Sequence, residues 1–162
     1  MAGGNCIEIG YESATPVYQR LTFQNLDLIY SLPNGDAPDP YWPEAALSIH
    51  PTQMSEYNSP ASMGTMPPVR DVTYRNIQIE SCQDDFFLDI RPNRNSPGAG
   101  IENILLENVS VVDSPFRPSR IVALTNHPIR NVTIRGLTIL GHSVTNAQQG
   151  KITVKNTKCG FP

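Results

Sequence analysis

Short apolar–polar–apolar segments in this chain carry acidic, imidazole and guanidinium side chains. Glu8 lies in the first of these segments, His50 follows the second, and Asp89 and Arg91 lie in and just after the third. Such groups donate and accept hydrogen bonds, as recognition of a sugar hydroxyl requires. A solvated surface with a local Asp89–Arg91 pair is the alternative interpretation of the same residues.

Two long loops add aromatic side chains to this polar set. Residues 31–45 hold four prolines and the adjacent Tyr41 and Trp42, and residues 51–68 hold Tyr57. A proline-stiffened aromatic loses little entropy when it stacks on a sugar ring, although Trp42 could equally fold back over the flank of the fold. The hypothetical carbohydrate-binding residues are Tyr41, Trp42, Tyr57, His50, Asp89, Arg91, Glu8 and Glu12.

Repeated strands are expected to position these residues. The pattern apolar-x-apolar-x-Asn-apolar-x-apolar occurs at residues 21–28, 72–79 and 104–111, and a copy with Gly in place of Asn occurs at 132–139. Asn and Gly tolerate left-handed backbone, so each copy predicts two strands joined by a sharp bend. Shorter strands are predicted between these copies, at 7–9, 47–49, 88–90, 122–124 and 152–154.

This alternation predicts a single-stranded, right-handed parallel β-helix of about five coils over residues 5–162. One unit cannot bury its own apolar side, so neighbouring units must stack. Asn25, Asn76 and Asn108 would then form a hydrogen-bonded ladder, which the alternative antiparallel β-sandwich does not explain. The predicted interior consists of Ile7, Ile9, Leu21, Phe23, Leu26, Leu28, Leu47, Ile49, Val72, Ile77, Ile79, Leu88, Ile90, Ile104, Val109, Val111, Leu124, Val132, Leu137 and Ile139.

Stacking also predicts rows of outward-facing side chains, because alternate residues of a strand point to opposite faces. The bent strands present mainly Thr and Ser, typical of a solvated sheet face. Their rows are Thr22, Thr73, Leu105 and Thr133, then Asp27, Gln78, Ser110 and Thr138. The short strands present Glu8, Ser48, Asp89, Ala123 and Thr153, then Gly10, His50, Arg91, Thr125 and Lys155.

Carboxylates in these rows keep a catalytic interpretation open. Inverting glycoside hydrolysis needs two carboxyl groups ~6.5–9.5 Å apart. Glu8 and Asp89 would lie two strand spacings apart, ~9.6 Å, just outside that window. Asp84 and Asp85 precede a predicted strand, where paired aspartates more often serve a turn.

Composition limits the classes of function. A chain of 162 residues with 39% hydrophobic content predicts one domain, and residues 1–4 are interpreted as an expression start joined to part of a longer chain. A net charge of −3 without a basic cluster disfavours nucleic acid, and no window approaches the ~18 apolar residues of a membrane span. Cys6, Cys82 and Cys159 are interpreted as buried free thiols, and no metal or other cofactor is expected.

The segment Cys6–Glu12 followed by Val17–Leu28 resembles a strand and the next coil of polygalacturonase-like (glycoside hydrolase family 28) right-handed β-helices. Ile129–Ile134 is similar to another coil of that superfamily. In those enzymes the catalytic aspartates precede the strand that Cys6–Glu12 resembles, and Asp84-Asp85 comes two coils too late to match them. The resemblance therefore carries over no catalytic residue.

A β-helix without catalytic coils is also similar to the β-helical carbohydrate-binding modules of family 89, which are attached to gut bacterial xylanases. This resemblance implies a non-catalytic module that binds xylan or a related plant hemicellulose. It also implies a secreted, extracellular bacterial protein with a covalently linked catalytic domain. The alternatives are a glycoside hydrolase or polysaccharide lyase fragment, and a structural β-solenoid that self-associates through an uncapped first coil at residues 5–13.

Overall fold

The computed structural model describes residues 6–10, 15–29, 45–51, 67–80, 86–92, 99–113 and 117–162. Every regular element within these ranges is a β-strand, so the predicted all-β class is confirmed. The described ranges contain no helix that could cross a membrane.

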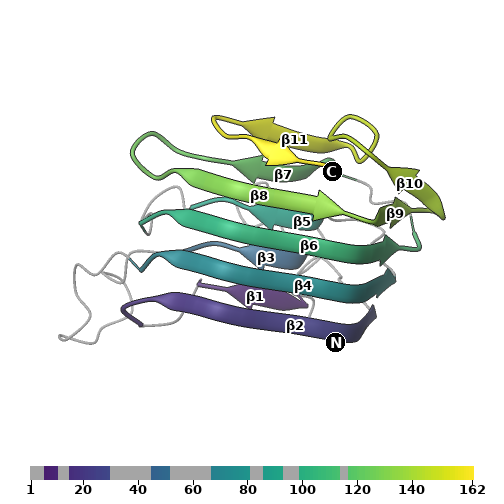
Figure 1. Cartoon of the computed structure of the whole chain (residues 1–162), viewed down its shortest axis with the longest axis horizontal. Coiled ribbons are helices and arrows are strands. Elements are labelled where there is room, and N and C mark those ends of the chain that lie inside the picture. Colours follow the sequence, from purple (N-terminus) through teal and green to yellow (C-terminus); the bar gives the residue numbers. More distant parts are fainter. Residues whose placement is uncertain are drawn as a thin grey trace, which may run out of the picture.

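Two sheets run side by side, and the chain alternates between them (Figure 1). The short-strand sheet is parallel throughout and consists, in order, of β1 (Ile7–Ile9), β3 (Ala45–Ile49), β5 (Phe86–Ile90), β7 (Ser119–Val122) and β11 (Ile152–Lys155). The long-strand sheet contains β2 (Tyr18–Ile29), β4 (Val69–Glu80), β6 (Ile101–Val111), β8 (Ile129–Arg135), β9 (Leu137–Ile139), β10 (His142–Val144) and β12 (Cys159–Gly160).

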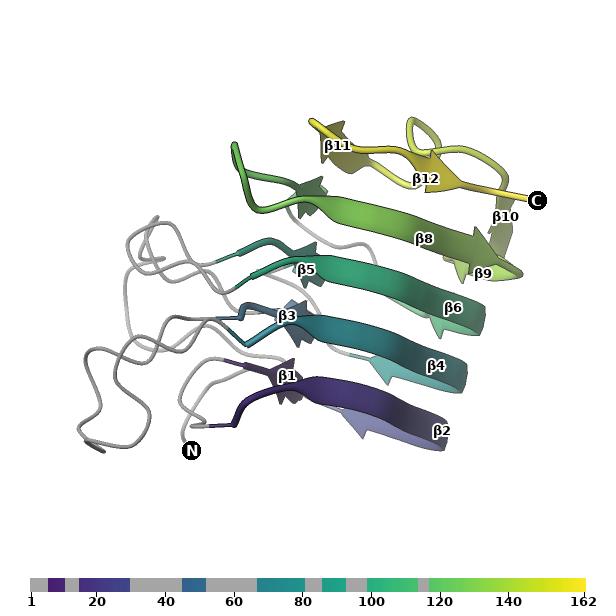
Figure 2. The same ribbon diagram turned by 60° about the vertical axis from the view of Figure 1, so that its left-hand side comes forward.

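Copies of the long repeat lie in register, as the sequence predicts. Leu21 pairs with Val72, Val72 with Ile104, and Ile104 with Val132. Figure 2 shows the short strands lying behind the long strands. Apolar side chains of both sheets meet in one core between them. Each unit thus buries the apolar side of its neighbour, which is the main force that holds the stack together.

The strand β2 lies at one edge of its sheet, and its apolar side chains are only half-buried. Its residues Leu21, Phe23, Leu26 and Leu28 pack against the core but stay partly exposed, whereas their counterparts in β4 are at most 2% exposed. No described strand pairs with the second edge of β2. These four residues of the predicted interior are therefore only partly buried. Ile139 in β9 (Leu137–Ile139) is also only partly buried.

The fourth short strand lies three residues from its predicted register, since Arg120 pairs with Asp89 where Ala123 was expected. Ile121 and Ala123 are buried, whereas Val122 and Leu124 are partly exposed. The run from Ile121 to Leu124 is apolar at every position, so it fits either facing of the side chains. A shift by an odd number of residues turns each side chain to the opposite face.

This shift changes the outward rows of the short-strand sheet. Arg120 lies beside Asp89 in the position predicted for Ala123. Val122 lies beside Lys155 in the position predicted for Thr125. The inward Ser119 is buried, and its hydroxyl accepts a hydrogen bond from the Leu88 amide, which satisfies a polar group inside the core.

The predicted bends and the asparagine ladder are confirmed. The φ angles of Asn25, Asn76, Asn108 and Gly136 are +57°, +51°, +54° and +66°. Asn76 Nδ2 donates to Asn25 Oδ1 at 3.0 Å, and Asn108 Nδ2 donates to Asn76 Oδ1 at 3.2 Å. Gly136 ends the ladder, because a Cβ there would lie 2.6 Å from Asn108 Oδ1.

A second ladder of bends was not predicted. Arg20, Asp71, Asn103 and Asn131 also have left-handed φ angles, between +53° and +57°. Asn103 Nδ2 donates to Asp71 Oδ1 at 2.8 Å, and Asn131 Nδ2 donates to Asn103 Oδ1 at 2.9 Å. The mixture of residue types at these positions hid the ladder, since only two of the four are asparagine.

Replacing Asn76 by Ala should lower the free energy of unfolding by about 1–3 kcal/mol, because two ladder hydrogen bonds are lost and Ala tolerates left-handed backbone poorly. Urea unfolding followed by circular dichroism measures the loss. Asn76→Gly is the matched control, since it keeps the backbone freedom and removes only the ladder bonds. A stability of Asn76→Ala equal to that of the wild type would contradict the ladder's contribution.

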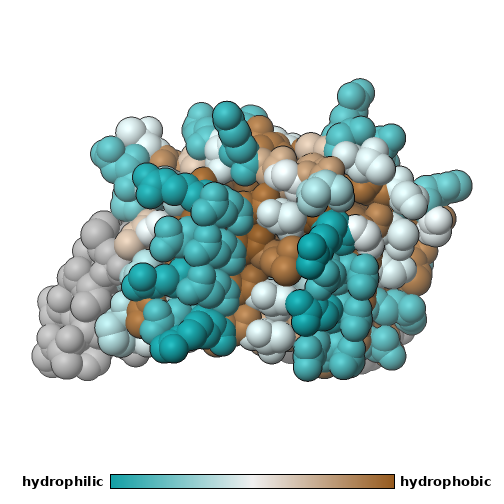
Figure 3. All heavy atoms as spheres, viewed as in Figure 1, coloured by the Kyte–Doolittle hydropathy of each residue, from teal (hydrophilic) through white to brown (hydrophobic). Residues whose placement is uncertain are grey.

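The outer face of the long strands combines the predicted rows with polar columns that the sequence did not predict. Thr22, Thr73, Leu105 and Thr133 align, as do Asp27, Gln78, Ser110 and Thr138. Figure 3 shows two hydrophilic columns on this face with a strip of white and brown residues between them. The Thr and Ser rows lie where the sequence predicts them, and the hydrophilic columns beside them were not predicted.

The C-terminal end adds two strands to the predicted set. The strand β10 lies between the last predicted long copy, 132–139, and the short strand predicted at 152–154, and pairs antiparallel with β9. The strand β12 follows the last predicted strand and pairs parallel with β8. Cys6 and Cys159 are free thiols, half-buried rather than buried, and burial raises the pKa of Cys159 to about 11. Cys82 lies outside the described residues.

Candidate functional site

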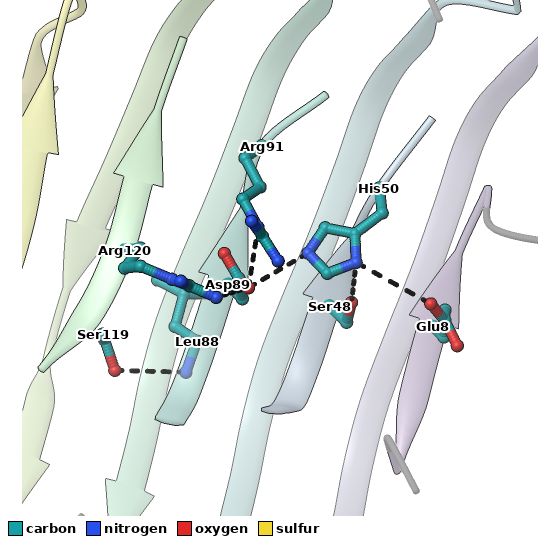
Figure 4. Close-up of polar contacts among 8 residues, drawn as sticks. All are labelled: Glu8, Ser48, His50, Leu88, Asp89, Arg91, Ser119 and Arg120. Atoms are coloured by element: carbon teal, nitrogen blue, oxygen red, sulfur yellow. Dashed lines mark hydrogen bonds and ion pairs between the residues drawn. The ribbon is translucent and has the colours of Figure 1, made fainter. Parts of the chain in front are cut away.

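Register in the short-strand sheet brings together the polar residues that the sequence singled out. Glu8 pairs with Ser48, Ser48 with Asp89, and Asp89 with Arg120, so four successive strands contribute to one row. Figure 4 shows the side chains of His50 and Arg91 turned toward Asp89 from the neighbouring row. We call Glu8, Ser48, His50, Asp89, Arg91 and Arg120 the charge network.

Asp89 is the centre of the charge network. Its Oδ2 atom lies 3.1 Å from His50 Nε2 and accepts a hydrogen bond of 3.1 Å from Arg91 Nε. Arg120 Nη2 donates to the same oxygen. Hydrogen bonds to ionised groups are stronger than neutral ones, so these contacts fix the carboxylate firmly.

His50 extends the network toward the first short strand. Its Nδ1 atom lies 3.3 Å from Ser48 Oγ and 3.8 Å from Glu8 Oε1. The imidazole therefore stands between two carboxylates, one on β1 and one on β5. Its own backbone amide donates to Ile9 O at 2.9 Å, which anchors the residue to the neighbouring strand.

The centre of the network is buried and its rim is partly exposed. The side chain of Asp89 is 0% exposed and that of His50 10%, whereas those of Arg91, Arg120 and Glu8 are 20%, 23% and 30% exposed. All residues of β3 are buried, although their side chains alternate between the two faces of the sheet. The outward-facing rows predicted for the short strands are thus buried at Ser48, His50 and Asp89.

The partners of Asp89 outweigh its burial. Burial raises the pKa of the carboxyl group, but the hydrogen bond and charge of His50, together with Arg91 and Arg120, hold that pKa below its ordinary value. The carboxylate therefore stays charged at neutral pH. Such a group accepts hydrogen bonds well and donates a proton poorly.

One oxygen of the central carboxylate lacks a hydrogen-bond partner. Asp89 Oδ1 is buried and has no hydrogen-bond partner within the described ranges. A buried acceptor without a partner costs free energy that a bound water would recover. The groups of the network that a ligand can reach are the partly exposed side chains of Glu8, Arg91 and Arg120.

Arg120 is the network residue that the sequence did not predict. It lies before the short strand predicted at 122–124, just ahead of the ambiguous apolar run at Ile121. The apolar–polar–apolar pattern could not reveal it, because the inward position before Arg120 is the polar Ser119. Tyr41, Trp42, Tyr57, Glu12 and Asp84-Asp85 lie outside the described residues.

No group of three or more His, Cys, Asp and Glu side chains within the described ranges is arranged to hold a metal ion. Comparison with family models, curated proteins and solved structures finds no significant match to the chain. The functional argument therefore depends on the geometry of the residues themselves.

Proposed function

We propose that this chain is a non-catalytic carbohydrate-binding module that recognises a plant cell-wall polysaccharide, with xylan as the expected ligand. The observation that carries this proposal is the pair of partly exposed guanidinium groups, Arg91 and Arg120, that the buried Asp89 carboxylate holds in place. Groups held in place before binding lose little entropy when a ligand arrives. Together with the partly exposed Glu8 carboxylate they offer donors and acceptors, which suits hydroxyl groups.

Proton-transfer chemistry fits the same network less well. A glycosidase needs a general acid whose pKa is raised, whereas that of Asp89 is lowered. Ser48, His50 and Asp89 lie within reach of one another in the order used for acyl transfer. Ser48, however, is 0% exposed, so a substrate carbonyl has no access to its hydroxyl group. These features favour binding over a hydrolase or lyase fragment.

The proposal includes a right-handed, single-stranded parallel β-helix of about five coils. Its support is the alternation of the chain between two stacks of parallel strands, since parallel crossover connections are right-handed in about 98% of cases. We further propose that the module acts outside the cell, linked covalently to the catalytic domain of a larger bacterial enzyme. The support for this context is the resemblance to family 89 modules.

Calorimetry and product analysis on the same protein test the proposal. The protein is titrated with soluble arabinoxylan, glucuronoxylan, polygalacturonate and mixed-linkage glucan, and each mixture is then analysed by chromatography. Binding of a xylan without release of oligosaccharides is the expected result. Release of oligosaccharides that stops in Asp89→Asn would replace the module by an enzyme.

Replacing Trp42 by Ala should weaken xylan affinity about tenfold or more. One stacked aromatic ring contributes ~1–3 kcal/mol by analogy with base stacking, and 1.4 kcal/mol corresponds to a tenfold change. Calorimetric titration of both proteins measures the change, and an unchanged melting temperature shows that the fold is intact. Wild-type affinity in Trp42→Ala would remove this loop from the site.

A second candidate function is assembly through the edge of β2 with which no described strand pairs. The half-buried Leu21, Phe23, Leu26 and Leu28 line that edge, and an exposed strand edge is a template for pairing with another chain. We expect the sedimentation coefficient to rise with protein concentration. Leu26→Lys should suppress the rise, while Gln24→Lys on the outward face of β2 should not. A monomer at every concentration would exclude this function.

A further inference from the structure

The outer face of the long-strand sheet contains a trough that runs along the stacking direction. Its floor is the row Thr22, Thr73, Leu105 and Thr133, aligned across four strands. In Figure 3 this face shows two hydrophilic columns that flank a strip of white and brown residues. We call this row and the two polar columns beside it the threonine trough.

The two walls of the threonine trough come from positions on either side of the floor. The first wall is the ladder of bend residues, and the second follows the floor two residues later along each strand. The residues of the first wall are Arg20, Asp71, Asn103 and Asn131. The residues of the second wall are Gln24, Arg75, Glu107 and Arg135.

Both walls are held in place by contacts between neighbouring units. In the first wall, Asn131 donates to Asn103, which donates to Asp71. In the second wall, Arg75 and Arg135 both bind the Glu107 carboxylate. Side chains fixed in this way need little ordering when a ligand binds.

The walls offer donors and acceptors in nearly balanced charge. Each ladder amide keeps hydrogen-bonding capacity beyond its ladder bond, because an amide carries two N–H donors and an oxygen with two lone pairs. Glu107 lies between Arg75 and Arg135, so the second wall has no run of like charges. This pattern suits hydroxyl groups, which both donate and accept, better than it suits a polyanion.

The floor argues against a protein partner. The cores of protein interfaces are rich in aromatic and other large apolar side chains and poor in charge. Three of the four floor residues are threonine, and Leu105 is the exception. A methyl-and-hydroxyl floor gives a sugar ring a shallow contact surface together with further hydrogen bonds.

We propose that the threonine trough is a second carbohydrate-binding face, which holds an extended neutral polysaccharide along the stacking direction. Each strand adds one floor residue and two wall residues at a spacing of ~4.8 Å, so an extended ligand meets polar wall groups at each step. The inference shares its ligand class with the proposed function but uses a different sheet. The two sites can therefore fail independently.

Filling the floor tests the proposal. Thr73→Lys and Thr133→Lys place a long side chain in the trough. Thr138→Lys is the control, because it makes the same change in the outward row that lies beyond the second wall. Arabinoxylan and xylohexaose are the neutral probes, and polygalacturonate is the charged control. We expect each floor variant to lower affinity for the neutral probes at least tenfold, while Thr138→Lys binds as the wild type does.

A variant of the charge network separates the two sites. Arg91→Gln, with its fold checked by circular dichroism, is titrated beside Thr73→Lys. Loss of binding in Thr73→Lys, whether or not Arg91→Gln also weakens binding, supports the trough. Loss in Arg91→Gln alone overturns the trough and leaves the proposed function standing. A wild-type protein that binds none of the probes overturns both.

Discussion

Replacing Asp89 by Asn is expected to lower the free energy of unfolding by about 3–5 kcal/mol, the usual cost of removing one partner from a buried charged group. The substitution keeps the shape of the side chain and removes its charge. Arg91, Arg120 and His50 would then surround a neutral amide at a position that is 0% exposed. Urea unfolding monitored by circular dichroism measures the loss.

The chain provides a matched control on its other sheet. Glu107 is also bound by two arginines from neighbouring units, Arg75 and Arg135, but those guanidinium groups are 43% and 50% exposed. Glu107→Gln should therefore lose much less stability than Asp89→Asn, since water solvates the remaining charges. Equal losses in the two variants would mean that burial does not govern the Asp89 contribution.

Acid titration provides a second readout of the Asp89 prediction. The folded-state pKa of Asp89 lies below the unfolded value of about 3.9, so its contribution is fully present above about pH 4. That contribution is lost as the pH falls through the lower folded-state pKa. Unfolding free energy should therefore fall more steeply below pH 4 in the wild type than in Asp89→Asn. Parallel profiles would contradict the assigned pKa direction.

Replacing Gly10 by Ala is expected to cost about 2–6 kcal/mol of unfolding free energy. The φ angle of Gly10 is +101°, and an added Cβ would lie 2.9 Å from Pro51 Cα and 3.0 Å from Pro51 N. Backbone strain of this kind costs about 1–3 kcal/mol, and overpacking adds about as much again. The clash is with backbone beside His50, so the change should also disturb the charge network.

Gly141→Ala isolates the backbone strain from the clash. Its φ angle is +74°, but an added Cβ would meet nothing within 4 Å. The difference in unfolding free energy between the two variants therefore measures the contact with Pro51. If Gly10→Ala proves no more destabilising than Gly141→Ala, that segment of backbone is free to move aside.

Periodicity made the strands and their outward rows predictable, because Asn25, Asn76 and Asn108 mark the same bend in each copy. It was uninformative at Ile121, where four successive apolar residues fit either facing of the side chains and concealed Arg120. It also missed the second ladder of bends, since Arg20, Asp71, Asn103 and Asn131 are of three residue types and arginine rarely adopts left-handed backbone. The alternation of apolar and polar residues also could not predict that Asp89 is buried. It specifies the face of the sheet that a side chain takes, but not what covers that face.

The charge network has an evolutionary consequence for the length of the chain. Units of a repeat protein contact only their neighbours, so in-frame duplication or deletion of a whole unit leaves distant units undisturbed. His50, Asp89 and Arg120 come from three consecutive units. Deleting the middle unit would set His50 beside Arg120 without the carboxylate between them. Selection on the network would therefore preserve the number and order of these units, while the end that carries β10 and β12 stays free to diverge.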